Sequence, residues 1–106
     1  MNFRYMRTML FFDLPTVTSK NKRDYRHFVK KIINLGFYRI QESVFVKMSI
    51  DNSAAENSIN NVKSIVPSDG NIFCITITEK QFAEMKVLLG ESSSNVLSTI
   101  ERFVEL

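Results

Sequence analysis

The chain has 106 residues, 44% hydrophobic content and a formal net charge of +3, which suits one compact domain with a modest core. No run approaches the roughly 20 apolar residues that cross a bilayer. The first apolar segment is short and ends at Asp13, so we expect no signal peptide. Cys74 is the only cysteine, which excludes an internal disulfide and predicts a small core residue in a cytoplasmic protein.

Charge is distributed unevenly along the chain. Residues 1–50 carry ten Lys/Arg against three Asp/Glu, whereas residues 51–106 carry four against eight. Positive charge concentrated in one half indicates a polyanionic partner. A solvated surface with uneven charge is the alternative that composition leaves open.

The stretch 5–14 is predicted to form a buried strand. Its segment 6–12 is apolar at all but two positions, which is typical of a strand covered on both faces. Pro15 ends the strand, because proline has no N–H and disfavours helical geometry in the residue before it. Asp13 therefore lies at the strand's carboxyl end, where it either takes part in chemistry or caps a turn.

A helix is predicted between a cap at Thr18 or Ser19 and a stop at Gly36. Apolar residues recur at spacings of three and four, and these are Tyr25, Phe28, Val29, Ile32 and Leu35. A row of cations falls on the opposite side, and these are Lys20, Arg23, Arg26, Lys30 and Lys31. Such a rigid positive face suits a phosphate backbone. His27 lies within this face, and we expect a surface residue there rather than a general base.

The residue pattern of segment 37–50 predicts two strands joined by a tight hairpin or bulge at Glu42–Ser43. Ser43 is a candidate catalytic hydroxyl, and a hairpin serine that bonds its own backbone is the alternative. The aromatic residues of these strands, such as Phe45, can stack on bases or belong to the core.

The sequence pattern of the second half of the chain predicts further helices and strands. A second helix is expected over 54–66, and a strand that is apolar on both faces is expected over 71–78. A short capped helix over 78–85 and a short strand over 86–90 come next. Residues 96–106 fit a helix and a strand equally well.

The order βαββαβ predicts an α+β, ferredoxin-like fold with an antiparallel sheet. This fold packs both helices on one sheet face, and the other face receives Met9, Phe11, Phe73, Ile75 and Ile77. Exposing five such side chains forgoes roughly 1.5–3 kcal/mol each, so we expect a homodimer in which a second copy covers this face.

Three segments resemble the signature blocks of the CRISPR-associated protein 2 family, in particular its type II-A branch. They are MRTMLFFDLPT over 6–16, GFYRIQESVF over 36–45, and TITEKQFAEM over 76–85 followed by LGE over 89–91. The blocks occur in the family's order and spacing, and the resemblance covers about residues 4–91.

The resemblance implies a ferredoxin-like homodimer with an extra C-terminal strand that reaches the partner's sheet. Residues 1–91 would form the domain, and residues 92–106 a tail that contacts the partner copy or another protein. It also implies a role in CRISPR adaptation, in which the dimer bridges two dimers of the CRISPR-associated protein 1 integrase. That complex binds double-stranded prespacer DNA and inserts it as a spacer.

Members of this family are also described as magnesium-dependent endonucleases whose strand-one aspartate, here Asp13, is the metal ligand. Arg39, Gln41, Ser43 and Phe45 match the family's RxQxSVF positions. The resemblance thus makes Asp13 and Ser43 catalytic candidates, and Arg39 joins the cations expected to bind nucleic acid. Mg²⁺ takes hard oxygen ligands, and a twofold axis near the first strand would bring two Asp13 carboxylates together. A toxin ribonuclease of the virulence-associated protein D type, which shares the fold, is the alternative.

Overall fold

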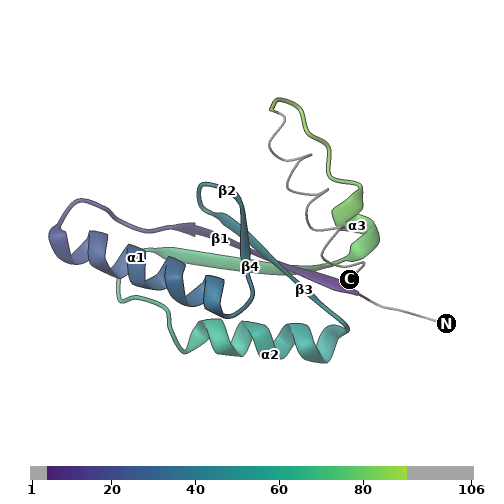
Figure 1. The fold of residues 1–106 in the computed structure, drawn as a ribbon, viewed down its shortest axis with the longest axis horizontal. Coiled ribbons are helices and arrows are strands. Elements are labelled where there is room, and N and C mark those ends of the chain that lie inside the picture. The colour runs from purple at the N-terminus through teal and green to yellow at the C-terminus, as the bar shows by residue number, and fades with distance from the viewer. Residues whose placement is uncertain (1–4, 91–106) are drawn as a thin grey trace.

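The structure is a computed structural model that describes residues 5–90. Its elements follow the predicted order βαββαβ and end with a short third helix (Figure 1). The strands and helices are β1 (Met6–Asp13), α1 (Ser19–Asn34), β2 (Tyr38–Gln41), β3 (Val44–Ser49), α2 (Asn52–Lys63), β4 (Asn71–Thr78) and α3 (Glu79–Ala83).

The four strands form one antiparallel sheet in the order β2-β3-β1-β4. The predicted α+β class and antiparallel sheet are therefore confirmed. Glu42 and Ser43 form the tight turn of the β2–β3 hairpin, and the register shifts between Arg39 and Gln41, so the hairpin contains both a turn and a bulge. The Phe12 N–H donates to the Ser43 carbonyl at 3.1 Å, which places the hairpin beside the carboxyl end of β1.

Both long helices begin at side-chain caps. The Thr18 hydroxyl accepts from the Asn21 N–H at 3.0 Å at the start of α1, and Gly36 follows the helix at φ +103°. The Asp51 carboxylate accepts from the Ala54 N–H at 2.8 Å at the start of α2. This helix ends at Lys63, three residues before the expected end.

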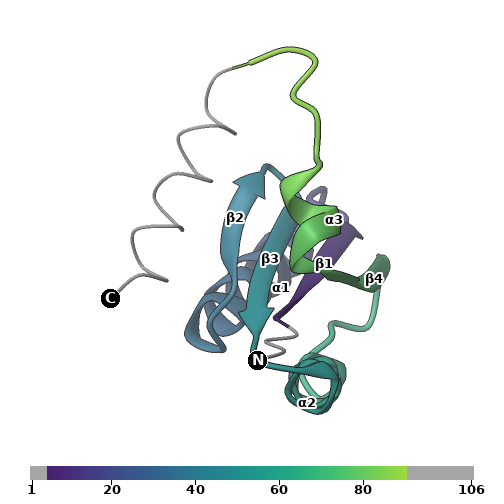
Figure 2. The same cartoon turned by 90° about the vertical axis from the view of Figure 1, so that its right-hand side faces the viewer.

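The helices α1 and α2 cover one face of the sheet, and α3 lies on the other (Figures 1 and 2). The first face holds the larger core, in which Phe12 packs edge-on against Phe28 at 5.2 Å and stacks on Phe45 at 5.6 Å between ring centroids. The burial of Phe45 and Phe37 confirms that these aromatics belong to the core.

The face opposite α1 is partly covered by the chain itself, which corrects the expectation of a bare surface. Met9 is buried against Val46 and Phe82, and Ile77 packs at the margin of this cluster. Phe82 belongs to α3, so the short helix shields one end of the face. The other end keeps an exposed patch, hereafter the apolar patch, which consists of Phe11, Phe73 and Ile75 at 38%, 69% and 51% exposure.

Two further expectations are wrong. Residues 86–90 form no strand, because no described strand pairs with them, and Leu88 and Leu89 are almost fully exposed. Cys74 is exposed rather than buried, because β4 is an edge strand and α2 leaves a recess above it. The tail at 92–106 and its expected strand lie outside the described residues. Within residues 5–90, no helix is long and apolar enough to cross a membrane.

Candidate functional site

The outer surface of α1 carries the predicted row of cations. All five side chains are exposed, and they are hereafter called the basic face: Lys20, Arg23, Arg26, Lys30 and Lys31. Lys20 pairs with Asp24 at 2.9 Å between Nζ and Oδ2, and this hydrogen bond is the main reason that the pKa of Asp24 lies below its ordinary value. The other four make no ion pair with described residues. They are therefore free to contact a polyanion.

His27 is exposed within the basic face, as expected for a surface residue. No carboxylate is hydrogen-bonded to its ring among the described residues. A general base needs a partner that fixes its tautomer, so the surroundings of His27 favour a surface role.

Arg39 lies on the same side of the sheet as α1. It stands opposite Phe45 in the β2–β3 ladder, and its guanidinium carbon lies 5.0 Å from the centre of that ring. Phe45 is fully buried, so the ring supports the arginine from the core side while the rest of Arg39 stays exposed. The position is compatible with a contact to the same polyanion as the basic face.

Asp13 is the last residue of β1, and its side chain is exposed. Successive side chains alternate between the two faces of a strand, and the neighbours Phe12 and Leu10 belong to the core under α1. Asp13 therefore projects from the opposite face, together with Phe11. The structure separates the two predicted sites, with the basic face on one side of the sheet and the carboxylate on the other.

Ser43 lies at the same end of the sheet as Asp13. It occupies the hairpin turn, is half-buried, and accepts the Phe12 N–H through its backbone carbonyl. This bond uses the backbone carbonyl and does not depend on the serine side chain. A catalytic role for its hydroxyl stays a prediction.

The residues around Asp13 fit a magnesium ion with few protein ligands. Within residues 5–90, no three His, Cys, Asp or Glu side chains gather as a metal site. Mg²⁺ keeps several waters and commonly binds through one or two carboxylates together with substrate phosphates. One exposed carboxylate at a strand end meets this requirement, and a second copy of the chain would supply another.

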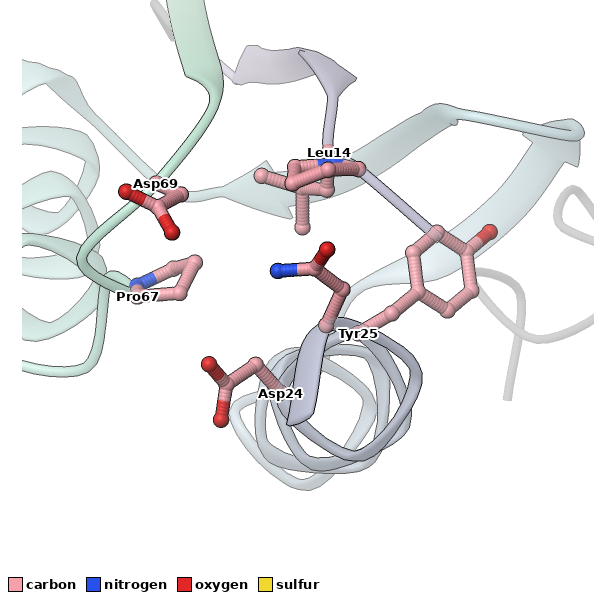
Figure 3. A pocket seen from close by; sticks show the side chains of 7 residues that line it. Leu14, Asp24, Tyr25, Pro67 and Asp69 are labelled. Atoms are coloured by element: carbon pink, nitrogen blue, oxygen red, sulfur yellow. The ribbon is translucent and has the colours of Figure 1, made fainter. Parts of the chain in front are cut away.

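Two other carboxylates, those of Asp24 and Asp69, face a small recess between α1 and the turn before β4 (Figure 3). Leu14 and Tyr25 complete the walls that Figure 3 labels, together with Pro67. Asp24 is already paired with Lys20. The recess is therefore a packing feature between the β1–α1 loop and the turn, and we assign no metal to it.

An ion pair of the buried Arg7 with the partly exposed Glu79, on the α3 side, has no counterpart among the predicted residues. Arg7 is 2% exposed, and it donates from Nε and Nη2 to the two Glu79 carboxylate oxygens at 2.6 Å each. Its Nη1 donates to the Tyr38 hydroxyl at 2.5 Å, and its guanidinium carbon lies 4.5 Å from the centre of the Phe82 ring. Burial raises the pKa of Tyr38 despite the neighbouring cation. This network joins β1, β2 and α3.

An arginine within an apolar strand is the only signal of this network in the sequence. Its main partner, Glu79, lies 72 positions away along the chain. Local patterns do not connect residues so far apart, so the pairing emerges only from the fold.

Together, the fold and the exposed charges define an α+β protein with one antiparallel sheet and a candidate nucleic-acid interface. The sequence profile described as "CRISPR associated protein Cas2" matches residues 6–85. The chain belongs to the Cas2 family. This match favours that family over the toxin ribonuclease alternative.

Similar proteins are named "CRISPR-associated endoribonuclease Cas2". The protein from Ligilactobacillus salivarius is 40% identical over 95% of this chain and 100% of its own length. The protein from Treponema denticola is 37% identical over the same shares, and one from Streptococcus mutans is 41% identical over 95% and 93%. A solved structure described as "Crystal structure of cas2" has a TM-score of 0.57 at 19% identity, covers 84% of this chain and 92% of its own, and shares the fold.

Proposed function

We propose that this chain acts in CRISPR spacer acquisition, as a homodimer that binds double-stranded prespacer DNA and bridges dimers of the CRISPR-associated protein 1 integrase. Membership of the Cas2 family supports this role. Relatives from Streptococcus and Ligilactobacillus support a type II-A-like system. The observation that carries the proposal is the basic face of α1.

The basic face suits a duplex backbone for a physical reason. A helix holds its side chains in fixed positions, and the duplex presents one phosphate charge per ~1.7 Å of its axis. Four of the five cations lack a competing carboxylate among the described residues. Each phosphate that they neutralise releases counterions, which favours binding without reading sequence.

The apolar patch supports the homodimer. Its three side chains lie on neighbouring strands, and the register pairs Phe11 directly with Phe73. Covering each large side chain is worth roughly 1.5–3 kcal/mol. A second copy brings an identical patch about a twofold axis, so one surface serves both partners. The division into a domain at 1–91 and a contacting tail at 92–106 is part of the same proposal.

A metal-dependent endonuclease activity is the second candidate function, and the names of the relatives support it. Asp13 would hold Mg²⁺, with Ser43 at the same end of the sheet as a candidate hydroxyl. When bound, the ion would supply an activated water and neutralise charge on a phosphate. Arg39 and the basic face lie on the other side of the sheet, so this activity would need a different path for the nucleic acid.

Charge reversal tests the scaffold role. The triple variant Arg23→Glu, Arg26→Glu and Lys30→Glu should abolish spacer integration with the partner integrase and weaken DNA binding. The slope of log affinity against log salt should fall by about 0.9 for each phosphate that the variant no longer neutralises. Fluorescence anisotropy at several salt concentrations measures this slope.

A matched control changes the same charge elsewhere. Lys63, Lys80 and Lys86 are exposed outside α1, and their triple reversal to Glu alters the net charge equally. This control should bind DNA with an unchanged salt slope. Equally weakened binding by both triple variants would contradict a role specific to α1.

Asp13→Ala separates the two candidate functions in one preparation. The scaffold role predicts intact integration, whereas the nuclease role predicts loss of magnesium-dependent cleavage. Failure of integration in this variant, with the dimer and DNA binding preserved, would overturn the scaffold proposal.

A further inference from the structure

Asp13 has a direct neighbour across the sheet that no motif singles out. In the β1–β4 ladder Asp13 stands opposite Asn71, the first residue of β4. Directly opposed residues in an antiparallel pair share a face, with Cβ atoms roughly 4.5–5.5 Å apart. Both side chains are exposed, so a carboxylate and a carboxamide emerge side by side at one end of the sheet.

The turn before Asn71 is fitted closely to the backbone of Asp13. Gly70 has φ +109°, and a Cβ added there would lie 2.6 Å from Leu14 Cδ2 and 2.9 Å from the Asp13 carbonyl oxygen. Real Cβ atoms essentially never approach other atoms this closely, so only glycine lets the turn lie here. The backbone of Asn71 is therefore held by this turn on one side and by the strand ladder on the other. This limits how far the Cα and Cβ atoms of Asn71 can move.

Neither side chain is used by the fold. Among the hydrogen bonds and ion pairs of residues 5–90, none involves the Asp13 carboxylate or the Asn71 carboxamide. The next pair along the same face is Phe11 and Phe73, both exposed. The two polar groups thus lie at the margin of the apolar patch, where a covering surface would shield them from water and strengthen their interaction with a cation.

We propose that the side-chain amide oxygen of Asn71 is a second protein ligand at the Asp13 site. Each chain then offers a carboxylate and a carboxamide to one divalent cation. Carboxylate and amide oxygens are both hard ligands of the kind that Mg²⁺ and Mn²⁺ take. This inference rests on the proposed metal role of Asp13. It adds a ligand from a strand distant in sequence and makes Gly70 a positioning residue.

Electron paramagnetic resonance measures the binding of Mn²⁺ to the full chain, and it tests this assignment without any activity assay. Asn71→Ala should weaken Mn²⁺ binding about 10-fold, and Asn71→Asp should tighten it, because it adds a second carboxylate. The double exchange Asp13→Asn with Asn71→Asp keeps the composition of the pair. It should therefore bind Mn²⁺ more tightly than Asp13→Ala. Asn61→Ala, an exposed asparagine on α2, is the matched control and should bind as the unmodified chain does.

The outcomes separate the two proposals. Loss of Mn²⁺ binding in Asp13→Ala together with unchanged binding in Asn71→Ala would overturn the role of Asn71 and leave that of Asp13 intact. Unchanged binding in Asp13→Ala, or no binding by the unmodified chain, would overturn the metal role of Asp13 and this inference with it. Circular dichroism of each variant checks that the fold is preserved, as expected for exposed positions.

Discussion

The two ends of β1 carry opposite charges on the same face of the sheet, and these charges differ in burial and in bonding. Arg7 is buried at one end, and its donors are engaged by Glu79 and Tyr38. Asp13 is exposed at the other end, and no described side chain bonds its carboxylate. The helix α3 covers the first end, and the apolar patch borders the second.

This difference divides one strand into a half that the fold engages and a half that is free to bind. A buried charge is tolerated only when its partners are in place, so the Arg7 end has one arrangement and little freedom to bind anything else. A charge left without a partner beside an exposed apolar patch costs the protomer little and remains available to a ligand or a second copy. Stability and binding should therefore respond to different ends of β1.

The largest expected effect on stability belongs to Arg7. Arg7→Ala leaves Glu79 and Tyr38 without their partner and removes the cation above the Phe82 ring. We expect a loss of about 3 kcal/mol in the free energy of unfolding, measured by urea denaturation. Glu79→Gln should cost less, because the Glu79 side chain is 41% exposed and water can replace part of the bond.

Asp13→Ala is the control at the other end of the strand. An exposed side chain without partners should change the free energy of unfolding by no more than ~0.5 kcal/mol. Comparable destabilisation by Arg7→Ala and Asp13→Ala would remove the distinction between the two halves.

The apolar patch should govern self-association. Phe73→Asp places a carboxylate at the most exposed position of the patch, and a central aromatic of an interface is typically worth about 2 kcal/mol or more. The dimer dissociation constant, measured by analytical ultracentrifugation, should rise ~30-fold or more. Val17→Asp introduces the same carboxylate at an apolar loop residue outside the patch, which is 85% exposed, and should leave association unchanged. A monomeric unmodified chain would contradict the proposed dimer.

Local patterns predicted the elements well because each has its own signals. The structure places the first helix's cap at Thr18, one of the two predicted positions, and the stop at Gly36 and the bounds of β4 also match. Local patterns predicted burial less well where burial depends on the position of a strand in the sheet. Cys74 alternates with apolar residues and resembles a core position, yet its strand lies at an edge, and only the sheet order shows this.

The site was predictable in parts. The basic face follows from helical spacing alone, because all five cations belong to one element. The Arg7–Glu79 pair and the Asp13–Asn71 pair join segments far apart in the chain, so they depend on strand register, which no local pattern specifies. The coverage of Met9 by α3 was missed for the same reason.

Tyr38 gives the Arg7 end a dependence on pH. Burial raises the pKa of Tyr38 above its ordinary value near 10, so the unfolded chain loses this proton at a lower pH than the folded chain. The contribution of Tyr38 is therefore fully present below about pH 10 and is lost as pH rises through the folded pKa. Tyr38→Phe should cost about 1 kcal/mol at neutral pH and reduce the loss of stability above about pH 10, as urea denaturation at several pH values would measure. An unchanged pH profile would contradict the burial of this hydroxyl.

The smallest effect belongs to the surface pair of Lys20 and Asp24, which serves as a contrast to the pair formed by the buried Arg7. The hydrogen bond from Lys20 holds the pKa of Asp24 below its ordinary value of 3.8, with further help from the charges of Arg23 and His27. A lowered pKa contributes stability that is present above the unfolded value and is lost as pH falls through the folded one. Because the pair lies at the surface, salt should weaken the shift, and Lys20→Ala should leave the urea midpoint unchanged.

Carboxyl-carbon NMR resolves this effect where denaturation does not. The titration midpoint of Asp24 should move up towards 3.8 in Lys20→Ala and should move less in Arg23→Ala, which removes only a charge at a distance. Added salt should reduce both differences. If Lys20→Ala left the midpoint unchanged, Lys20 would be as free as the other four cations of the basic face, and all five would then be available to a polyanion.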